Sequence, residues 1–72
     1  SGKPLLSKSV QIPRGEGEIA AALKKIASEH ENLSIGSYPY NDGEKVGTNI
    51  VVRGADRNEL KALAEELKSK LL

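Results

Sequence analysis

The chain has 72 residues, which is enough for one small domain and too few for a second. It contains no cysteine, which excludes a disulfide scaffold, a cysteine-based zinc site and a thiol nucleophile, and its 1 histidine excludes a histidine-rich metal site. The net charge of +1 is not the surplus of a dedicated DNA-binding protein, and no apolar run is long enough to span a membrane. Because no signal peptide is visible either, we expect a cytoplasmic protein.

The first residues carry little structural information. Residues 1–4 are expected to form a disordered lead-in, and Ser1-Gly2 resembles a remnant of a cloning tag. No repeat or linker divides the rest of the chain. We therefore expect a single domain over residues 5–72.

A strand is predicted from Leu5 to Ile12, where apolar and polar side chains alternate and Pro13 closes the segment. Lys8 interrupts the apolar side of this strand near its start. The apolar side is otherwise made of Leu6, Val10 and Ile12.

A helix is predicted to follow, beginning near Gly15 and running to about Glu29. Acidic residues stand at its start and basic residues near its end, an order that complements the helix dipole. His30 is most simply interpreted as a cap at the helix C-terminus. The core-facing stripe consists of Ile19, Leu23, Ile26 and Ala27.

Two further strands are predicted as a hairpin. The first runs from Leu33 to Tyr38, where Pro39 limits pairing, and the second is the β-branched segment from Val46 to Arg53. Between them, Asp42-Gly43 supplies the positive-φ position of a tight turn.

The last element is the clearest amphipathic helix of the chain. Asp56 is a typical N-cap, and Glu59 three residues later resembles the second half of a capping box. The apolar stripe comprises Leu60, Leu63, Ala64, Leu67 and Leu71.

The order of elements predicts an α+β fold. A right-handed β-α-β crossover leaves a gap that the third strand fills, so we expect a β-α-β-β-α two-layer sandwich with sheet order 1-3-2 and the third strand antiparallel to both neighbours. Both helices then cover one face, as in a ferredoxin-like fold that lacks its last strand. The first strand keeps a free edge, and the second face of the sheet stays uncovered.

A regular pleat predicts which side chains the uncovered face carries. A bulge at Gly36 would reverse the parity of the two tyrosines. The polar character of the face fits three interpretations: a docking surface for another domain, a stacking platform for single-stranded nucleic acid, or an ordinary solvated face. The expected residues are Ser7, Ser9, Gln11, Ser34, Tyr38, Tyr40, Asn49, Val51 and Arg53.

Catalytic motifs are weak. The segment Gly15–Ala20 fits the pattern G-x-G-x-x-A between a strand and a helix, but Glu16 and Glu18 would repel a pyrophosphate. Neither a Walker loop nor the G-x-x-G clamp of a nucleic-acid-binding KH domain occurs. We therefore expect no catalytic residue, no metal site and no cofactor.

One segment is more distinctive than its composition. Leu33–Pro39 reads Leu-Ser-Ile-Gly-Ser-Tyr-Pro, follows a helix that begins Gly-Glu-Ile-Ala, and precedes a β-branched strand and a closing helix. This order resembles the small subdomain after the molybdopterin-binding-like domain in the CinA (competence/damage-inducible) family, and a related region of eukaryotic FAD synthases. The resemblance implies a KH-type fold without the nucleic-acid clamp, with the family's chemistry in other domains.

These observations lead to two functional hypotheses. The first is a noncatalytic accessory module, excised from a larger nucleotide-metabolism protein of CinA-like or FAD-synthase-like type, that docks against neighbouring domains or a second copy. The alternative is a small module for single-stranded nucleic acid, which the weak net charge disfavours. An excised natural fragment and a redesigned sequence both stay open. The candidate binding residues, from the family signature and the open sheet face, are Ser37, Tyr38, Pro39, Tyr40, Asn49 and Arg53.

Overall fold

The computed structural model describes residues 4–72, so most of the expected lead-in lies outside the described residues. Neither helix within this range is long and apolar enough to cross a membrane. The order of elements agrees with the one predicted from sequence. The elements are β1 (Leu6–Ile12), α1 (Glu16–Ser28), β2 (Ser34–Asn41), β3 (Val46–Gly54) and α2 (Arg57–Leu71).

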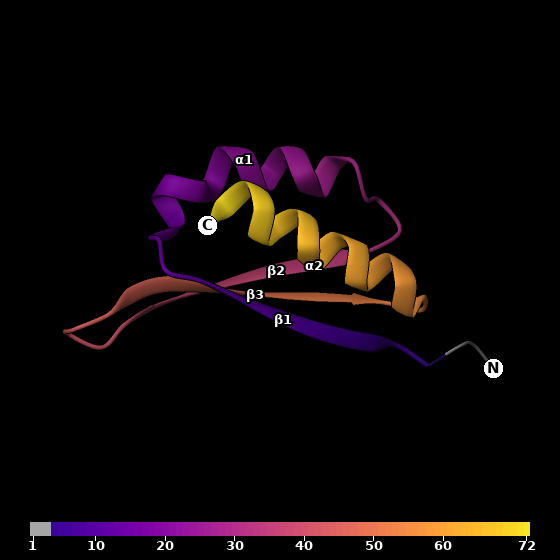
Figure 1. The fold of residues 1–72 in the computed structure, drawn as a ribbon, viewed down its shortest axis with the longest axis horizontal. Coiled ribbons are helices and arrows are strands. Elements are labelled where there is room, and N and C mark those ends of the chain that lie inside the picture. Colours follow the sequence, from indigo (N-terminus) through magenta and orange to yellow (C-terminus); the bar gives the residue numbers. More distant parts are fainter. Residues whose placement is uncertain (1–3) are drawn as a thin grey trace.

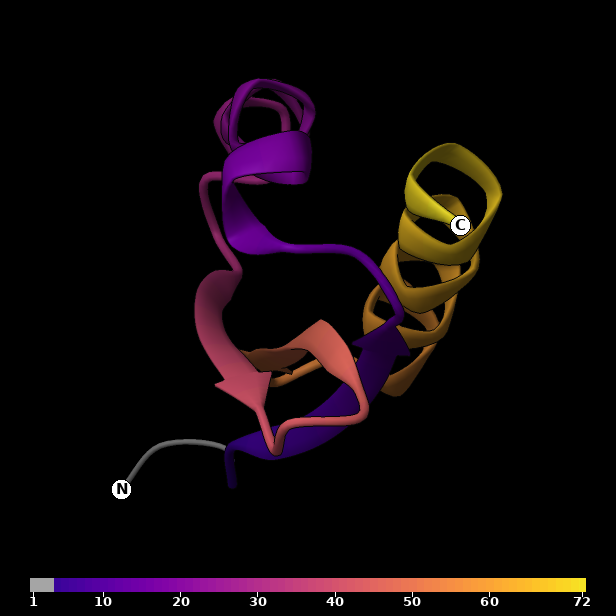
Figure 2. The same ribbon diagram turned by 90° about the vertical axis from the view of Figure 1, so that its left-hand side faces the viewer.

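The three strands form one sheet in the order β1-β3-β2, and β3 is antiparallel to both neighbours. Both helices lie on the same side of this sheet, as Figure 1 and the perpendicular view of Figure 2 show. The predicted two-layer α+β sandwich is therefore confirmed. The β2–β3 hairpin projects beyond the helices at one end of the molecule (Figure 1).

The ladder between β2 and β3 is regular. Its register runs without interruption from the pair Ser34↔Arg53 to the pair Asn41↔Val46. The suggested bulge at Gly36 is therefore wrong, because Gly36 pairs with Val51 in the same register. The parity predicted for the tyrosines consequently holds.

β2 is longer than predicted, since it continues through Pro39 to Asn41. The strand is at the edge of the sheet, and a proline without an N–H donor is tolerated where that position faces outward. The hairpin then closes in the expected way. Gly43 has φ +94°, and the Asp42 carboxylate accepts hydrogen bonds from the backbone N–H groups of Glu44 and Lys45.

The core lies between the sheet and the helices. The whole predicted stripe of α2 is buried, whereas Leu23 and Ala27 of α1 are only half-buried. α2 therefore packs over the middle of the sheet more completely than α1 does. The buried apolar side chains are Val10, Ile12, Ile19, Ile26, Ile50, Val52, Leu60, Leu63, Ala64, Leu67 and Leu71.

One polar side chain is buried in this core. Thr48 of β3 is fully buried, and its hydroxyl donates a hydrogen bond of 3.0 Å to the backbone carbonyl oxygen of Arg14. Arg14 belongs to the connection between β1 and α1. The bond satisfies a hydroxyl that would be costly to bury alone, and it holds that connection against the sheet.

The helix ends agree only in part with the sequence. Asp56 caps α2 by accepting hydrogen bonds from the N–H groups of Asn58 and Glu59. The side chain of Glu59, however, accepts a bond of 2.8 Å from the Asn32 amide. Only the first half of a capping box is therefore present.

His30 has a different role from the predicted one. Glu29 is the C-cap of α1, and the ring Nε2 of His30 lies 2.9 Å from a carboxylate oxygen of Glu66 on α2. The side chain therefore links the end of α1 to the second helix. A helix cap was expected because the sequence shows only what is local to His30.

Candidate functional site

The side of the sheet that carries no helix, called the open face below, holds all nine side chains predicted for it. The ladders put Ser7, Arg53 and Ser34 in one row, and Gln11, Asn49 and Tyr38 in another. Gly36 and Gly47 have the same parity and belong to the same face. The open face therefore combines two aromatic rings, one guanidinium, small polar groups and two glycines.

Tyr40 covers one of these glycines. It pairs with Gly47 across the β2–β3 ladder, and its ring occupies the space where a Cβ on Gly47 would stand. The same Cβ would lie 2.7 Å from the backbone carbonyl oxygen of Ile12 on β1. The glycine is required by this close approach, and the tyrosine replaces the missing side chain as cover.

Tyr38 covers the other glycine. A Cβ on Gly36 would lie 3.3 Å from Cε2 and 3.3 Å from the phenol oxygen of Tyr38, so the ring leans back along its own strand. The side chain is nevertheless 55% exposed. Glycines beneath the rings let both aromatics lie close to the backbone, and the outer face of Tyr38 is free for contact.

Polar groups continue the face beyond the rings. Asn49 is half-buried between its two ladder partners, Tyr38 and Gln11. Arg53 is exposed two rows further along β3, and it forms no ion pair within residues 4–72. An aromatic platform with a nearby unpaired guanidinium can stack on planar groups and bind carboxylates or phosphates.

The remaining two candidate residues lie on the opposite side of the sheet. Ser37 pairs with the buried Ile50 and Pro39 with the buried Thr48, so both face the helices. The hydroxyl of Ser37 donates a hydrogen bond of 2.8 Å to Glu16 in the first turn of α1. The six candidates therefore divide by parity: Tyr38, Tyr40, Asn49 and Arg53 share a surface, and Ser37 and Pro39 do not.

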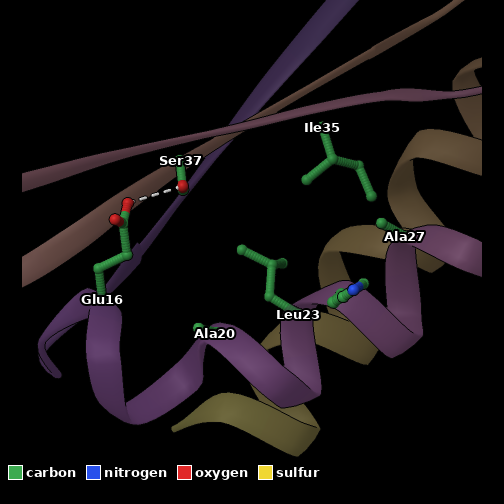
Figure 3. Close-up of a pocket in the computed structure, with 7 residues that line it drawn as sticks. Glu16, Ala20, Leu23, Ala27, Ile35 and Ser37 are labelled. Atoms are coloured by element: carbon green, nitrogen blue, oxygen red, sulfur yellow. Dashed lines mark hydrogen bonds between the residues drawn. The ribbon is translucent and has the colours of Figure 1, made fainter.

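A groove separates α1 from β2. It has a volume of ≈ 290 Å³, and Figure 3 shows Ala20, Leu23 and Ala27 of the helix facing Ile35 of the strand. The Glu16–Ser37 hydrogen bond closes one end. Sequence reasoning missed this groove, because Leu23 and Ala27 were expected in the core-facing stripe of the helix.

Titratable groups with shifted pKa lie elsewhere. Hydrogen bonds from the backbone N–H groups of Lys45 and Glu44 lower the pKa of Asp42 in the hairpin turn. Hydrogen bonds from Lys70 and then His30 lower the pKa of Glu66, and the same contact raises the pKa of Lys70. Within the described part of the chain, no three His, Asp or Glu side chains gather in a way that could hold a metal ion.

A comparison with protein-family models found a match. A family model described as "FAD synthase, middle domain" matches residues 4–72, which is nearly the whole chain. Searches of curated proteins and of solved structures found no significant match. The resemblance to FAD synthases that Leu33–Pro39 indicated is therefore confirmed.

Proposed function

Because the chain belongs to the FAD synthase middle-domain family, we propose that it is a noncatalytic accessory domain of a larger cytoplasmic nucleotide-metabolism protein. The description of the family as a middle domain supports neighbours on both sides. We extend the proposal to a kinship with the KH-type subdomain of the CinA family. The β-α-β-β-α order and the Ile35–Pro39 segment support that kinship.

The accessory role is exerted through the open face, which docks against a flanking domain of the same polypeptide. The observation that carries this proposal is Tyr38, an aromatic side chain that is 55% exposed on a sheet face without helices. Tyr and Arg are enriched at protein interfaces because they combine a large contact area with hydrogen bonding. Tyr38 and Arg53 supply both on one surface.

The experiment compares the isolated chain with a longer FAD synthase that contains it. Hydroxyl-radical footprinting measures the reaction rate of Tyr38 in each protein. Val46 is the matched control, because it is 54% exposed but has the parity of the helix side. We expect severalfold protection of Tyr38 in the longer protein and little change at Val46. Equal reactivity of Tyr38 in both proteins would refute docking through the open face.

A second copy is the other possible occupant, and sedimentation equilibrium of the isolated chain tests it. A monomer at micromolar concentrations is the expected result. A dimer whose dissociation constant increases on replacing Tyr38 with Ala would assign the open face to self-association instead.

The noncatalytic part of the proposal has its own test. The isolated chain is incubated with ADP-ribose, and release of AMP is followed by chromatography. We expect no turnover, because the groups with shifted pKa lie on the hairpin turn and on α2, apart from the open face. Turnover that survives further purification would overturn the noncatalytic assignment.

One observation favours a second function. Tyr38 and Tyr40 rest on glycines, and Tyr38 leans over Gly36, one ladder row from Arg53, an arrangement that suits base stacking with a phosphate contact. The net charge of +1 argues against strong binding of a polyanion. Titration of labelled single-stranded RNA at low and high salt decides this, since salt-sensitive binding lost on Tyr38→Ala would favour nucleic acid over a protein partner.

A further inference from the structure

A second surface lies where the free edge of β1 meets the first turns of α2. It is a groove of ≈ 470 Å³, called the β1-edge groove below. Leu60 is buried and Leu6 is half-buried, so they supply apolar contact area, while three exposed cations stand around them. The lining residues are Leu6, Ser7, Lys8, Arg57, Leu60 and Lys61.

The three cations of the groove have no direct carboxylate partner in the described part of the chain. Lys8, Arg57 and Lys61 form no ion pair within residues 4–72. The two acidic residues nearest in sequence are engaged elsewhere. Asp56 accepts hydrogen bonds from backbone N–H groups of α2, and Glu59 accepts one from Asn32. The lining of the groove thus contains three cations and no acidic residue, although the whole chain is nearly neutral.

Each of these positive charges is also at a position where it does not stabilise the fold. Arg57 and Lys61 are four residues apart on α2, a spacing at which like charges repel. Arg57 is the first residue of the helix, where the dipole disfavours positive charge. Lys8 is opposite Val52 on the helix side of the sheet, in a series that is otherwise apolar. A negatively charged partner would compensate all three.

The geometry of β1 indicates the form of that partner. β1 pairs with β3 on one side only, so its other edge offers backbone groups to an added strand. A lysine on the inner side of an edge strand normally discourages such pairing. Such a lysine would disfavour an apolar or basic strand but not an acidic one, because a carboxylate on the incoming strand would neutralise it.

We propose that the β1-edge groove binds an extended acidic peptide segment, which adds to β1 as a strand. Carboxylates on its helix-facing side pair with Lys8, Arg57 and Lys61, and an apolar side chain between them contacts Leu6 and Leu60. This site does not include Tyr38, and Ser7 is its single residue from the open face. It stands whether or not the open face docks a domain.

The test uses a seven-residue peptide, as long as β1, with the sequence Thr-Glu-Thr-Val-Thr-Glu-Thr and a fluorescent label. Anisotropy measures its affinity for the 72-residue chain. We expect the triple variant Lys8→Glu, Arg57→Glu, Lys61→Glu to bind it at least about tenfold more weakly, because the three changed groove residues then repel the two glutamates of the peptide instead of attracting them. The same variant should bind the peptide with Lys in place of Glu better than the parent chain does.

A matched control keeps the net charge of that variant but changes three other lysines, Lys25, Lys45 and Lys68, to Glu. It should bind the peptide within about twofold of the parent chain once salt screens the long-range charge. Replacing Tyr38 with Ala should leave peptide binding unchanged, which separates this site from the open face. Amide NMR shifts should move in β1 and in the first turns of α2.

Two further probes separate strand addition from simple attraction of anions. The first is the same peptide with its inner backbone nitrogens methylated, and the second is inorganic phosphate as competitor. If the peptide adds to β1 as a strand, the methylated peptide should not bind, and inorganic phosphate should compete only weakly with the unmodified peptide. The proposal is overturned by an absence of binding, by equal binding of the methylated peptide, by full displacement with phosphate, or by equal weakening in both triple variants.

Discussion

The ring of Tyr40 on β2 lies over Gly47 on β3, its partner in the antiparallel ladder. The same glycine also meets the carbonyl oxygen of Ile12 on β1, so one position without a side chain admits contacts from both neighbouring strands. At Gly47, near the hairpin end of the sheet, β3 therefore lies close to both edge strands, β2 and β1. Replacing that glycine is therefore the first test of the open face.

Gly47→Ala should destabilise the domain by about 1–3 kcal/mol, because the new methyl group meets the Ile12 carbonyl oxygen, which is backbone and cannot rotate away. Chemical denaturation measures the free energy of unfolding. Gly17→Ala is the control: nothing lies within 4 Å of its Cβ position in α1, and alanine should stabilise the helix by roughly 0.5 kcal/mol. Equal stability of the two variants would contradict the close approach at Gly47.

Ser37→Ala should cost about 0.5–1.5 kcal/mol, because it removes the hydrogen bond that ties β2 to Glu16 in the first turn of α1. A double-mutant cycle with Glu16→Ala should show a coupling of about 0.5 kcal/mol or more. Ser28→Ala is the control, since its hydroxyl bonds only to the carbonyl of Lys25 within the same helix. A coupling near zero would mean that the bond contributes nothing in solution.

Thr48→Val should destabilise by about 0.5–1.5 kcal/mol although valine has nearly the same shape, because the hydrogen bond from the buried Thr48 hydroxyl to the carbonyl oxygen of Arg14 is lost. Thr48→Ser keeps that donor and removes a methyl group from the core, so its cost should be that of a small cavity. Thermal unfolding of both variants gives the comparison. Should valine prove neutral, the hydroxyl is not what holds the Arg14 connection.

Glu66→Gln should lower stability by roughly 0.5–1 kcal/mol at neutral pH, because the carboxylate that Lys70 and His30 contact is lost. These contacts lower the pKa of Glu66 below its ordinary value of 4.5. A lowered folded-state pKa gives stability that is present above the ordinary value and disappears as the pH falls through the lower one.

The difference in unfolding free energy between parent and Glu66→Gln should therefore shrink as the pH falls below 4.5. Denaturant titrations over a pH series measure it. Glu65→Gln is the control, because Glu65 is more exposed and its Lys68 contact is 3.9 Å long. A difference that grows on acidification would show that the sign of the Glu66 shift is wrong.

Much of the fold was predictable from residue spacing. The α2 stripe from Leu60 to Leu71 repeats with the period of a helix, and every member is buried. The alternation in the strands has a period of two, and it correctly predicted that Tyr38 of β2 shares one face of the sheet with Asn49 and Arg53 of β3. Sheet order 1-3-2 followed because the handedness of the crossover leaves only that gap for β3.

Contacts between distant segments were not predictable in the same way. His30 was interpreted from its neighbours in sequence as a cap, but it contacts Glu66, 36 positions further along the chain. β2 was expected to end before Pro39. The sequence of the strand alone does not show that β2 is an edge strand, and proline is tolerated at a sheet edge. The bond between Ser37 and Glu16 also depends on where α1 crosses β2.

The candidate site also combines features that the sequence determined with features that depend on tertiary contacts. By itself the sequence determined the elements, their order and the face on which each strand residue points, because those properties repeat with the local geometry of the backbone. Only the tertiary structure decided that Tyr38 and Tyr40 rest on glycines, that Ser37 belongs to a helix contact, and that Lys8 meets Arg57 and Lys61 in one groove. Such meetings depend on register and on helix placement, which the packing of the whole chain sets.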